Sequence, residues 1–428
     1  MAKVIIFIPR SPFLDYDRVM PFLGPMYLKS FLESKGHKID IDDSPDLDNI
    51  PDLNGYDFIG ISTTTPQYFS NGKAFAEEVK KKYPHKKMII GGAHARNYSQ
   101  ELLEEGLFSH IVRGDGEFAF LDILEGKELP VVINAEQLTS EQMESLPIPW
   151  RDKEFLSKYN YFIEGKKATT VMASRYCPMR CKFCEERDCK LTLYSPERLD
   201  KELEEIKNLG YEAVMFYDDI LPLSKERTEK ICEITKKYGI IFRCNGHVKT
   251  MSHQPELLQV MKDAGCVEIC LGIESTDQRI LDIVDKGNKV EEIFQATRNV
   301  LNSGLKLSAY LIIGLPGESK ESIANTEKYI AEFSGNPLFT FDYTIFYPYR
   351  HTYIRENLQE FDLQVYLEGS TGAYKQSGGI SECCISTSSL SQEDIVKERE
   401  RIIEKYKDNF RGYASSNLAQ KNNNLIQK

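Results

Sequence analysis

Short apolar runs alternate with amphipathic segments along most of this chain, and this alternation limits the folds that it can adopt. Within residues 1–126, unbroken apolar runs predict strands at 3–9, 37–43, 57–62, 87–92 and 110–116. The amphipathic segments between or after them predict helices near 22–35, 67–83, 98–105 and 117–125. Unbroken apolar strands separated by helices favour a parallel sheet covered on both faces, so we expect a doubly wound α/β domain.

The same rhythm returns in a second predicted domain, residues 168–346. Further strands are predicted at 168–174, 212–217, 239–243, 267–272, 307–314 and 338–346. The helices between them are predicted near 195–209, 224–237, 254–264, 290–303 and 319–333. Proteins built from such repeats place their functional residues at the carboxyl ends of the strands. We therefore expect functional side chains directly after the strands.

Composition narrows the class of protein. The chain has 428 residues, of which 41% are hydrophobic, and this is enough for two or three cored domains. Its net charge is −11 with both signs mixed along the chain, so no basic footprint for nucleic acid is present. No apolar stretch reaches the length of a membrane span, and we predict a soluble cytoplasmic protein that binds neither nucleic acid nor membrane. Its ten cysteines, without a secretion signal, favour reduced thiols or metal ligands over disulfides.

Two regions lack the strand and helix rhythm. Residues 127–167 contain prolines, mixed charge and Trp150, and they predict a linker in which Trp150 is a packing anchor. Residues 347–428 predict a C-terminal region that covers the substrate, with an amphipathic helix at 391–408 and a disordered tail. Several ring side chains either line the substrate cavity or pack in the core: Tyr343, Tyr347, Tyr349 and His351.

Three cysteines gather directly after the predicted strand 168–174, at Cys177, Cys181 and Cys184. A structural zinc site would need a closed set of four ligands, for which Cys189 is available, but the first spacing fits paired zinc knuckles poorly. A disulfide does not suit the predicted compartment. Three thiolates in one loop suit a [4Fe–4S] cluster that keeps one iron open, and Cys189 is then dispensable.

The other cysteines are interpreted as small core or surface thiols. Only Cys244 lies near the predicted carboxyl ends of the strands. The rest are Cys232, Cys266, Cys270, Cys383 and Cys384.

The loop RYCPMRCKFCE, with its Cys-x-x-x-Cys-x-x-Cys spacing after a first strand, resembles the defining loop of the radical S-adenosylmethionine (SAM) superfamily. The resemblance implies a partial (β/α)6 barrel, a [4Fe–4S] cluster and SAM, which a reduced cluster cleaves to a 5′-deoxyadenosyl radical. It also implies an electron donor such as flavodoxin or ferredoxin. Phe183 matches the aromatic residue that packs near the adenine, although it would serve equally as a core residue.

Polar residues after the other strands match further SAM contacts of that family. One of Asp218 and Asp219 would accept hydrogen bonds from the methionine amino group, or both would cap a helix. Glu274 lies in GIES, which resembles the fourth-strand motif, and GLPGE resembles the motif that recognises adenine or is simply a good turn. The remaining candidate contacts are Arg243 and Asn245, for the carboxylate and ribose hydroxyls, and Gly314 and Pro316 of the turn.

The first domain resembles the cobalamin (B12)-binding domain of cobalamin-dependent radical SAM proteins over residues 3–125, although its loops are also ordinary turn sequences. The resemblance assigns cobalamin contacts to small or polar loop residues: Thr63, Thr64, Thr65, Gly91, Gly92, His94, Gly114, Gly116 and Glu117. No Asp-x-His-x-x-Gly occurs, so we expect the lower face of cobalamin without a protein histidine. A bulky side chain at Gly92 is then expected to weaken cobalamin binding and to spare the cluster.

The leading functional prediction is a cobalamin-dependent radical SAM methyltransferase. By resemblance, it would methylate an unactivated carbon of a small molecule or peptide through a 5′-deoxyadenosyl radical and methylcobalamin. The first alternative is a radical SAM enzyme that catalyses cyclisation, elimination or rearrangement, with cobalamin silent or absent. The second alternative is a non-catalytic iron–sulfur or zinc sensor. The sequence does not identify the substrate.

Overall fold

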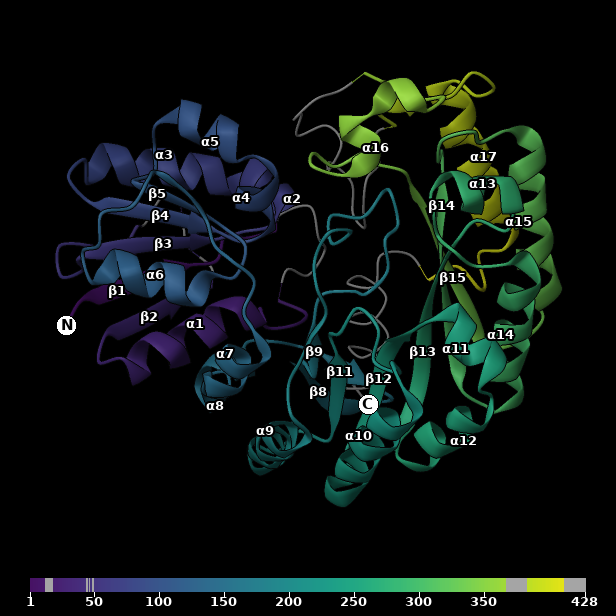
Figure 1. The fold of residues 1–428 in the computed structure, drawn as a ribbon, viewed down its shortest axis with the longest axis horizontal. Coiled ribbons are helices and arrows are strands. Elements are labelled where there is room, and N and C mark those ends of the chain that lie inside the picture. The colour runs from purple at the N-terminus through teal and green to yellow at the C-terminus, as the bar shows by residue number, and fades with distance from the viewer. Residues whose placement is uncertain (12–17, 44, 46, 48–49, 367–382, 412–428) are drawn as a thin grey trace, which may run out of the picture. The chain divides into compact units, whose positions relative to one another are not determined.

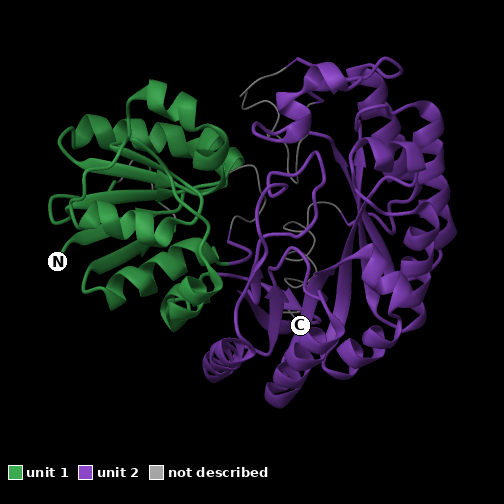
Figure 2. Cartoon of the chain, viewed as in Figure 1, with its two compact units in different colours: residues 1–17, 21–158 green, residues 18–20, 159–428 purple. Residues whose placement is uncertain are grey.

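The computed structural model describes residues 1–11, 18–43, 45, 47, 50–366 and 383–411. The chain divides into two compact units, residues 1–17 with 21–158 and residues 18–20 with 159–428 (Figure 2). The segment predicted as a linker, 127–167, is divided between the two units, with 127–158 in the first and 159–167 in the second. None of the described helices is both long enough and apolar enough to span a bilayer.

The first unit is built on a parallel sheet in the order β2-β1-β3-β4-β5-β6 (Figure 1). Its strands are β1 Lys3–Phe7, β2 Lys38–Asp42, β3 Phe58–Ser62, β4 Lys87–Gly91, β5 His110–Arg113 and β6 Val132–Asn134. The predicted strands are therefore present as a doubly wound parallel sheet. Strand β6 was not predicted, because three residues carry too little pattern to be distinguished from a loop.

Helices cover both faces of this sheet, with α1 and α6 on one face and α3, α4 and α5 on the other (Figure 1). Their bounds are α1 Leu23–Ser34, α2 Thr65–Gln67, η1 Tyr68–Gly72, α3 Lys73–Lys82, α4 Ala93–Asn97, α5 Ser99–Glu105, α6 Gly116–Leu124, α7 Ser140–Ser145 and α8 Lys153–Ser157. The helix predicted at 67–83 is divided by the π-helical turn η1. A buried cluster that includes Phe7, Ile61 and Phe75 joins β1, β3 and α3.

The second unit contains a curled sheet in the order β15-β14-β13-β12-β11-β8-β7, with its helices on the outside (Figure 1). The parallel strands are β8 Lys166–Val171, β11 Ala213–Phe216, β12 Ile241–Gly246, β13 Cys266–Glu274, β14 Lys306–Ile313 and β15 Phe339–Ile345. Strand β7, Phe162–Ile163, is antiparallel to β8 at one edge. The arrangement is a half-barrel of six βα repeats, as the sequence predicted.

The helices of the half-barrel separate consecutive strands. They are α9 Pro196–Asn208, α10 Lys225–Tyr238, α11 Val248–His253, α12 Glu256–Asp263, α13 Gln278–Ile283, α14 Val290–Asn302 and α15 Lys320–Phe333. The C-terminal elements are α16 Tyr353–Glu356, η2 Leu358–Glu360, β16 Gln364–Val365, β17 Ile385–Ser386 and α17 Gln392–Lys405. Helix α17 corresponds to the amphipathic segment predicted at 391–408, and the predicted disordered tail lies outside the described residues.

Two loops meet closely at the carboxyl edge of the first sheet. The Thr63 amide donates to the Gly91 carbonyl at 3.2 Å, and the His94 amide donates to the Thr63 carbonyl at 3.3 Å. Gly92 lies between them with φ 94°. A Cβ at Gly92 would stand 2.6 Å from the Thr63 carbonyl oxygen, whereas a Cβ at Gly91 would meet nothing closer than 4.0 Å. Of these two glycines, Gly92 is therefore the one restricted to glycine by its surroundings.

We predict that Gly92→Ala destabilises the protein by about 1–3 kcal/mol, because the new Cβ meets backbone and the left-handed conformation is strained. Gly91→Ala is the matched control and should change stability by less than about 0.5 kcal/mol. Urea unfolding followed by circular dichroism measures both. Equal effects of the two substitutions would contradict the packing argument.

Candidate functional site

The cysteine loop is closed at its base by hydrogen bonds. It leaves strand β8 and forms a short antiparallel pair, β9 Ser174–Arg175 with β10 Thr192–Leu193. The Tyr194 amide donates to the Ala173 carbonyl at 3.0 Å. The Arg227 guanidinium donates to the carbonyls of Ala173 and Tyr194 at 2.6 and 3.0 Å. Both ends of the loop are therefore held at one point.

Asp218 completes this clamp from the end of strand β11. Its buried carboxylate accepts hydrogen bonds from the Ala173 amide, at 2.9 and 3.1 Å, and from the Ser174 hydroxyl. Burial raises the pKa of Asp218 to about 7, although the bonds from Ser174 and Ala173 lower it. Asp218 is therefore engaged by the loop, whereas its neighbour Asp219 is exposed.

The three thiols predicted as cluster ligands lie in this one loop. Cys181 is buried, and Cys177 and Cys184 are half-buried. The Met179 amide points at the Cys177 sulfur at 3.5 Å, and the Glu186 amide points at the Cys184 sulfur at 3.4 Å. Backbone N–H groups directed at cysteine sulfur help to set the reduction potential of an iron–sulfur cluster. The loop therefore fits a three-cysteine cluster.

Burial dominates the acid–base properties of these thiols. It raises the pKa values of Cys177 and Cys181, and it raises that of Cys184 to about 12. Metal coordination is what converts such thiols to thiolates. Among the described residues, no three His, Cys, Asp or Glu side chains converge as ligands of a single metal ion. Cys189 is half-buried in the same loop.

Glu274 ends strand β13 in a strained conformation and pairs with a residue that the sequence did not identify. It has φ 64°, and the register with β14 shifts between Gly272 and Glu274. Its Oε1 lies 2.7 Å from Nζ of Lys286, which in turn lies 5.7 Å from the centroid of the Phe183 ring. A Cβ at Gly272 would approach Glu274 Oε1 to 2.6 Å. Glu274 and Lys286 are thus brought near Phe183 of the cysteine loop.

The GLPGE turn is closed by its own glutamate. Gly314 and Gly317 have φ 90° and 80°, and Pro316 is buried. The Glu318 carboxylate accepts from the Gly314 amide at 3.3 Å and from the Ser322 hydroxyl. Burial raises the pKa of Glu318 to about 7. Recognition of adenine by this turn stays a prediction.

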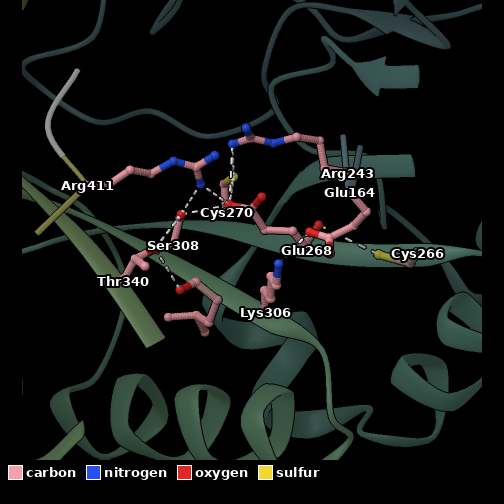
Figure 3. A network of polar contacts seen from close by, with 10 residues as sticks. Glu164, Arg243, Cys266, Glu268, Cys270, Lys306, Ser308, Thr340 and Arg411 are labelled. Carbon is pink, nitrogen blue, oxygen red and sulfur yellow. Dashed lines mark hydrogen bonds and ion pairs between the residues drawn. The ribbon is translucent and has the colours of Figure 1, made fainter. Parts of the chain in front are cut away.

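Arg243 lies on the concave side of the half-barrel, in a network of buried charges (Figure 3). Its Nη2 is 3.0 Å from the Cys270 sulfur and 3.5 Å from Glu268 Oε1. Arg411 also pairs with Glu268 and donates to Ser308. Burial would raise the pKa of Glu268, but Arg243 and Arg411 outweigh it and lower the pKa to about 2. Because Arg243 is engaged by Glu268, we leave it out of the proposed SAM contacts.

Other predicted residues near the strand ends make internal contacts. Asn245 donates its amide to the Asp218 carbonyl at 2.8 Å. Cys244 is fully buried, so it does not line the strand ends. Tyr343 and Tyr347 are buried, which is consistent with packing, whereas His351 is exposed. Trp150 packs against Phe155, with the ring centroids 5.0 Å apart and the rings tilted.

The predicted cobalamin residues fall into an accessible group and a buried group. Thr64, Gly91, Gly92, Gly114 and Gly116 are half-buried or exposed, and Thr63, Thr65, His94 and Glu117 are buried. The accessible group carries little side chain, so this edge fits a flat ring lying against backbone. Gly114 has φ 97°, and a Cβ there would stand 2.5 Å from the Ala135 carbonyl.

His94 is a core residue of the first unit. Its ring stacks on Tyr68 at 4.0 Å and on Tyr98 at 4.8 Å. Burial lowers the pKa of His94 to about 3, so the imidazole is neutral at physiological pH. We therefore leave His94 out of the proposed cobalamin contacts. Substitution of Gly92 is likewise no clean test of cobalamin binding, since any side chain there meets Thr63 first.

Asp342 lies on strand β15, on the same side of the sheet as Thr340. The Thr340 hydroxyl is 2.9 Å from the hydroxyl of Ser308, which belongs to the charged network. Its carboxylate makes no hydrogen bond or ion pair with the residues that the structure describes. Burial raises the pKa of Asp342 to about 7; Arg411, Arg243 and Arg399 lower it, and Glu268 raises it. Asp342 is thus a half-buried acid without a neutralising partner in the described chain.

Each unit contains a segment that matches a known family model. Residues 171–330 match the radical SAM superfamily, and residues 15–124 match the B12 binding domain. The chain is 26% identical over 338 residues to an uncharacterized methyltransferase of Pyrococcus horikoshii, with 72% of each protein covered. It is 24% identical over 302 residues to an anaerobic magnesium-protoporphyrin IX monomethyl ester cyclase of Rubrivivax gelatinosus, covering 64% of this chain and 53% of the cyclase.

A solved structure shares the fold over most of this chain. It is the radical S-adenosylmethionine methyltransferase TsrM from Kitasatospora setae, with cobalamin and a [4Fe–4S] cluster bound. The TM-score is 0.65 at 14% identity, over 85% of this chain and 77% of TsrM. At this identity the likeness establishes the arrangement of strands and helices.

We predict that replacing Cys177, Cys181 and Cys184 together by alanine abolishes the cluster, because these are the thiols of the clamped loop. Iron and sulfide analysis after anaerobic reconstitution checks this. Cys189→Ala is the matched control in the same loop and should keep full iron content. Iron that survives the triple substitution but is lost in Cys189→Ala would overturn the ligand assignment.

A second prediction concerns pH. The pKa of Asp342 is about 7 in the folded protein, above its usual value, so folded protein holds the proton more tightly than unfolded protein does. The contribution of Asp342 to the free energy of unfolding is then largest below about pH 4, and it is lost as pH rises through about 7. Asp342→Asn should show a smaller fall in melting temperature between pH 5 and pH 8 and should melt higher than the parent at pH 8. Parallel melting curves would contradict it.

Proposed function

Because this chain belongs to the radical SAM superfamily and carries a B12 binding domain, we propose that it is a methyltransferase acting on an unactivated carbon of a small molecule or peptide. It is a radical SAM enzyme, and the cofactors of its two domains are a [4Fe–4S] cluster, SAM and cobalamin. The observation that carries the proposal is the presence of both units in one chain. The similarity to a methyltransferase over 72% of each protein supports it.

When bound, these cofactors supply a 5′-deoxyadenosyl radical and a carrier for the methyl group. The chain's own residues bind and orient them. We propose that Cys177, Cys181 and Cys184 hold the cluster, and that Asp219 and Glu274 accept hydrogen bonds from the amino and hydroxyl groups of SAM. Glu274 is suited to this role because Lys286 and Gly272 fix the position of its carboxylate.

In the first unit, we propose that the accessible edge formed by Thr64, Gly91, Gly114 and Gly116 holds the corrin ring. These residues present backbone and one hydroxyl rather than bulky side chains. Two of the predicted loops are themselves fixed, since the Thr64 amide donates to Gln67 at 3.0 Å and Gly114 packs against the Ala135 carbonyl. A rigid edge of this kind binds a ligand without first paying to order its loops.

A second candidate is a radical SAM cyclase that does not transfer a methyl group. The similarity to a magnesium-protoporphyrin IX monomethyl ester cyclase over 64% of this chain favours it. Both candidates begin with the same cleavage of SAM. They differ in whether SAM also gives up its methyl group, and this difference can be measured without knowing the substrate.

Either reaction needs one electron at a time from outside the chain. We propose a flavodoxin or a ferredoxin as the physiological donor, because these proteins deliver single electrons at low potential. A chemical reductant replaces the donor in the test.

We predict that the reconstituted protein, with cobalamin, SAM and a low-potential reductant, releases both 5′-deoxyadenosine and S-adenosylhomocysteine. The first reports radical formation and the second reports removal of the methyl group. With no substrate present, S-adenosylhomocysteine should approach one equivalent per bound cobalamin. Liquid chromatography with mass spectrometry measures both products.

The control is the triple cysteine variant, which should form no 5′-deoxyadenosine above background. If the parent protein forms 5′-deoxyadenosine without S-adenosylhomocysteine, the cyclase candidate is favoured and methyl transfer is excluded. If it forms neither, the sensor alternative is favoured.

A further inference from the structure

Lys286 has a fixed backbone beside the cysteine loop. It follows helix α13, and its amide donates to the Leu281 carbonyl at 3.0 Å. The preceding residue, Asp285, has φ 55°, so the helix ends in a left-handed cap of the Schellman type. The chain therefore holds Lys286 at one position before any side-chain contact is made.

The segment that carries Lys286 is joined to the cysteine loop at two points. The Lys182 amide donates to the Val284 carbonyl at 2.8 Å. Arg187 pairs with Asp285 at 3.3 Å, and its side chain is only 16% exposed. These contacts fix the Lys286 segment relative to the loop, one within the stretch between Cys181 and Cys184 and the other just after it.

The ammonium of Lys286 is directed at that same stretch. It lies 5.7 Å from the centroid of Phe183, the residue directly before Cys184. Nζ of Lys286 lies 2.7 Å from Oε1 of its partner Glu274. The side chain of Lys286 is 14% exposed, and that of Glu274 is 10% exposed. Water therefore screens this pair weakly, so its charges act over a longer range than surface charges do.

A buried ion pair is seldom retained for stability alone, since the cost of removing two charges from water offsets their attraction. Here the two charges adjoin a site whose chemistry begins with the gain of an electron. A nearby cation favours the reduced cluster, and a nearby carboxylate disfavours it.

We propose that Lys286 sets the reduction potential of the iron–sulfur cluster, by cancelling the charge of Glu274 beside the cysteine loop. The inference rests on Cys177, Cys181 and Cys184 as cluster ligands. In the step concerned, one electron passes from an external donor to the cluster, and no bond in the protein forms or breaks. With Glu274 uncompensated, the same donor would reduce the cluster less completely.

The test is a dye-mediated redox titration of anaerobically reconstituted holoprotein without SAM, followed by electron paramagnetic resonance. The measurement is made at pH 8.5, so that carboxyl groups are ionised. We expect Lys286→Met to lower the ratio of reduced to oxidised cluster about tenfold at a given applied potential. For a one-electron couple, this corresponds to a reduction potential lower by ~59 mV. Glu274→Gln should raise the ratio by a similar factor.

Three controls separate charge from structure. Lys286→Arg keeps the charge and should retain the parent potential. The double variant Glu274→Gln with Lys286→Met removes both charges and should return close to the parent potential. Lys249→Met removes an exposed lysine whose Nζ lies 3.9 Å from the Cβ position of Gly287 in the same segment, and should change nothing.

Iron content is measured first for every variant. If the parent protein takes up no cluster, the ligand assignment fails rather than the role of Lys286. If Lys286→Met and Glu274→Gln take up iron but keep the parent potential, or shift it in the same direction, the proposal is overturned. If neither takes up iron, the pair holds the loop in place, and the proposal is overturned as well. If only Glu274→Gln takes up iron, a higher reduction potential in that variant supports the proposal, and an unchanged or lower potential overturns it.

Discussion

Both backbone groups of Ala173 form hydrogen bonds, and the geometry of the cysteine loop depends on them. Its amide donates to the Asp218 carboxylate, and its carbonyl accepts from Arg227 and from the Tyr194 amide. Hydrogen bonds to charged groups stabilise by about 1.5–3 kcal/mol each, whereas doubling the length of a loop costs only about 0.6 kcal/mol. A long loop closed by such bonds at its base can therefore be ordered. This closure holds the two ends of the loop that carries the thiols, Lys182 and Phe183.

The sequence predicted the parallel strands of both units because their apolar runs are continuous and are bounded by turns. It missed short elements. Strand β6 has three residues, and helices α4, α11 and α13 have five or six, which is less than two helical turns and too short for an amphipathic period to be recognised. The cysteine triplet was recognisable because its spacing is local. The predictions were therefore best where the pattern repeats within a short window.

Site residues were harder to predict where a strand boundary or a distant partner decides their role. The strand predicted at 239–243 extends over Ile241–Gly246, and this shift moves Arg243 from the end of the strand to its interior. Lys286 was missed because a lysine after a helix has the same local pattern as a solvated one. The role proposed for it follows only from Glu274, which is brought near by the strained end of strand β13. A buried charge of this kind is recognised from the residue that it pairs with, and the sequence does not show which distant residues form pairs.

The charged network on the concave side also explains how the open half-barrel ends. A sheet that does not close leaves an edge strand with unpaired backbone groups, which is a site for unwanted pairing. Here the Phe341 amide donates to Asn409, and the Arg411 amide donates back to Phe341, so residues 409–411 extend the sheet beyond β15. Glu268 binds the Arg411 side chain from β13, two strands away from that edge. The ion pair between Glu268 and Arg411 thus stabilises residues 409–411 against the sheet, because their few backbone hydrogen bonds alone would hold them weakly. Antiparallel β7 covers the opposite edge, so both edges of the half-barrel are paired within the described chain.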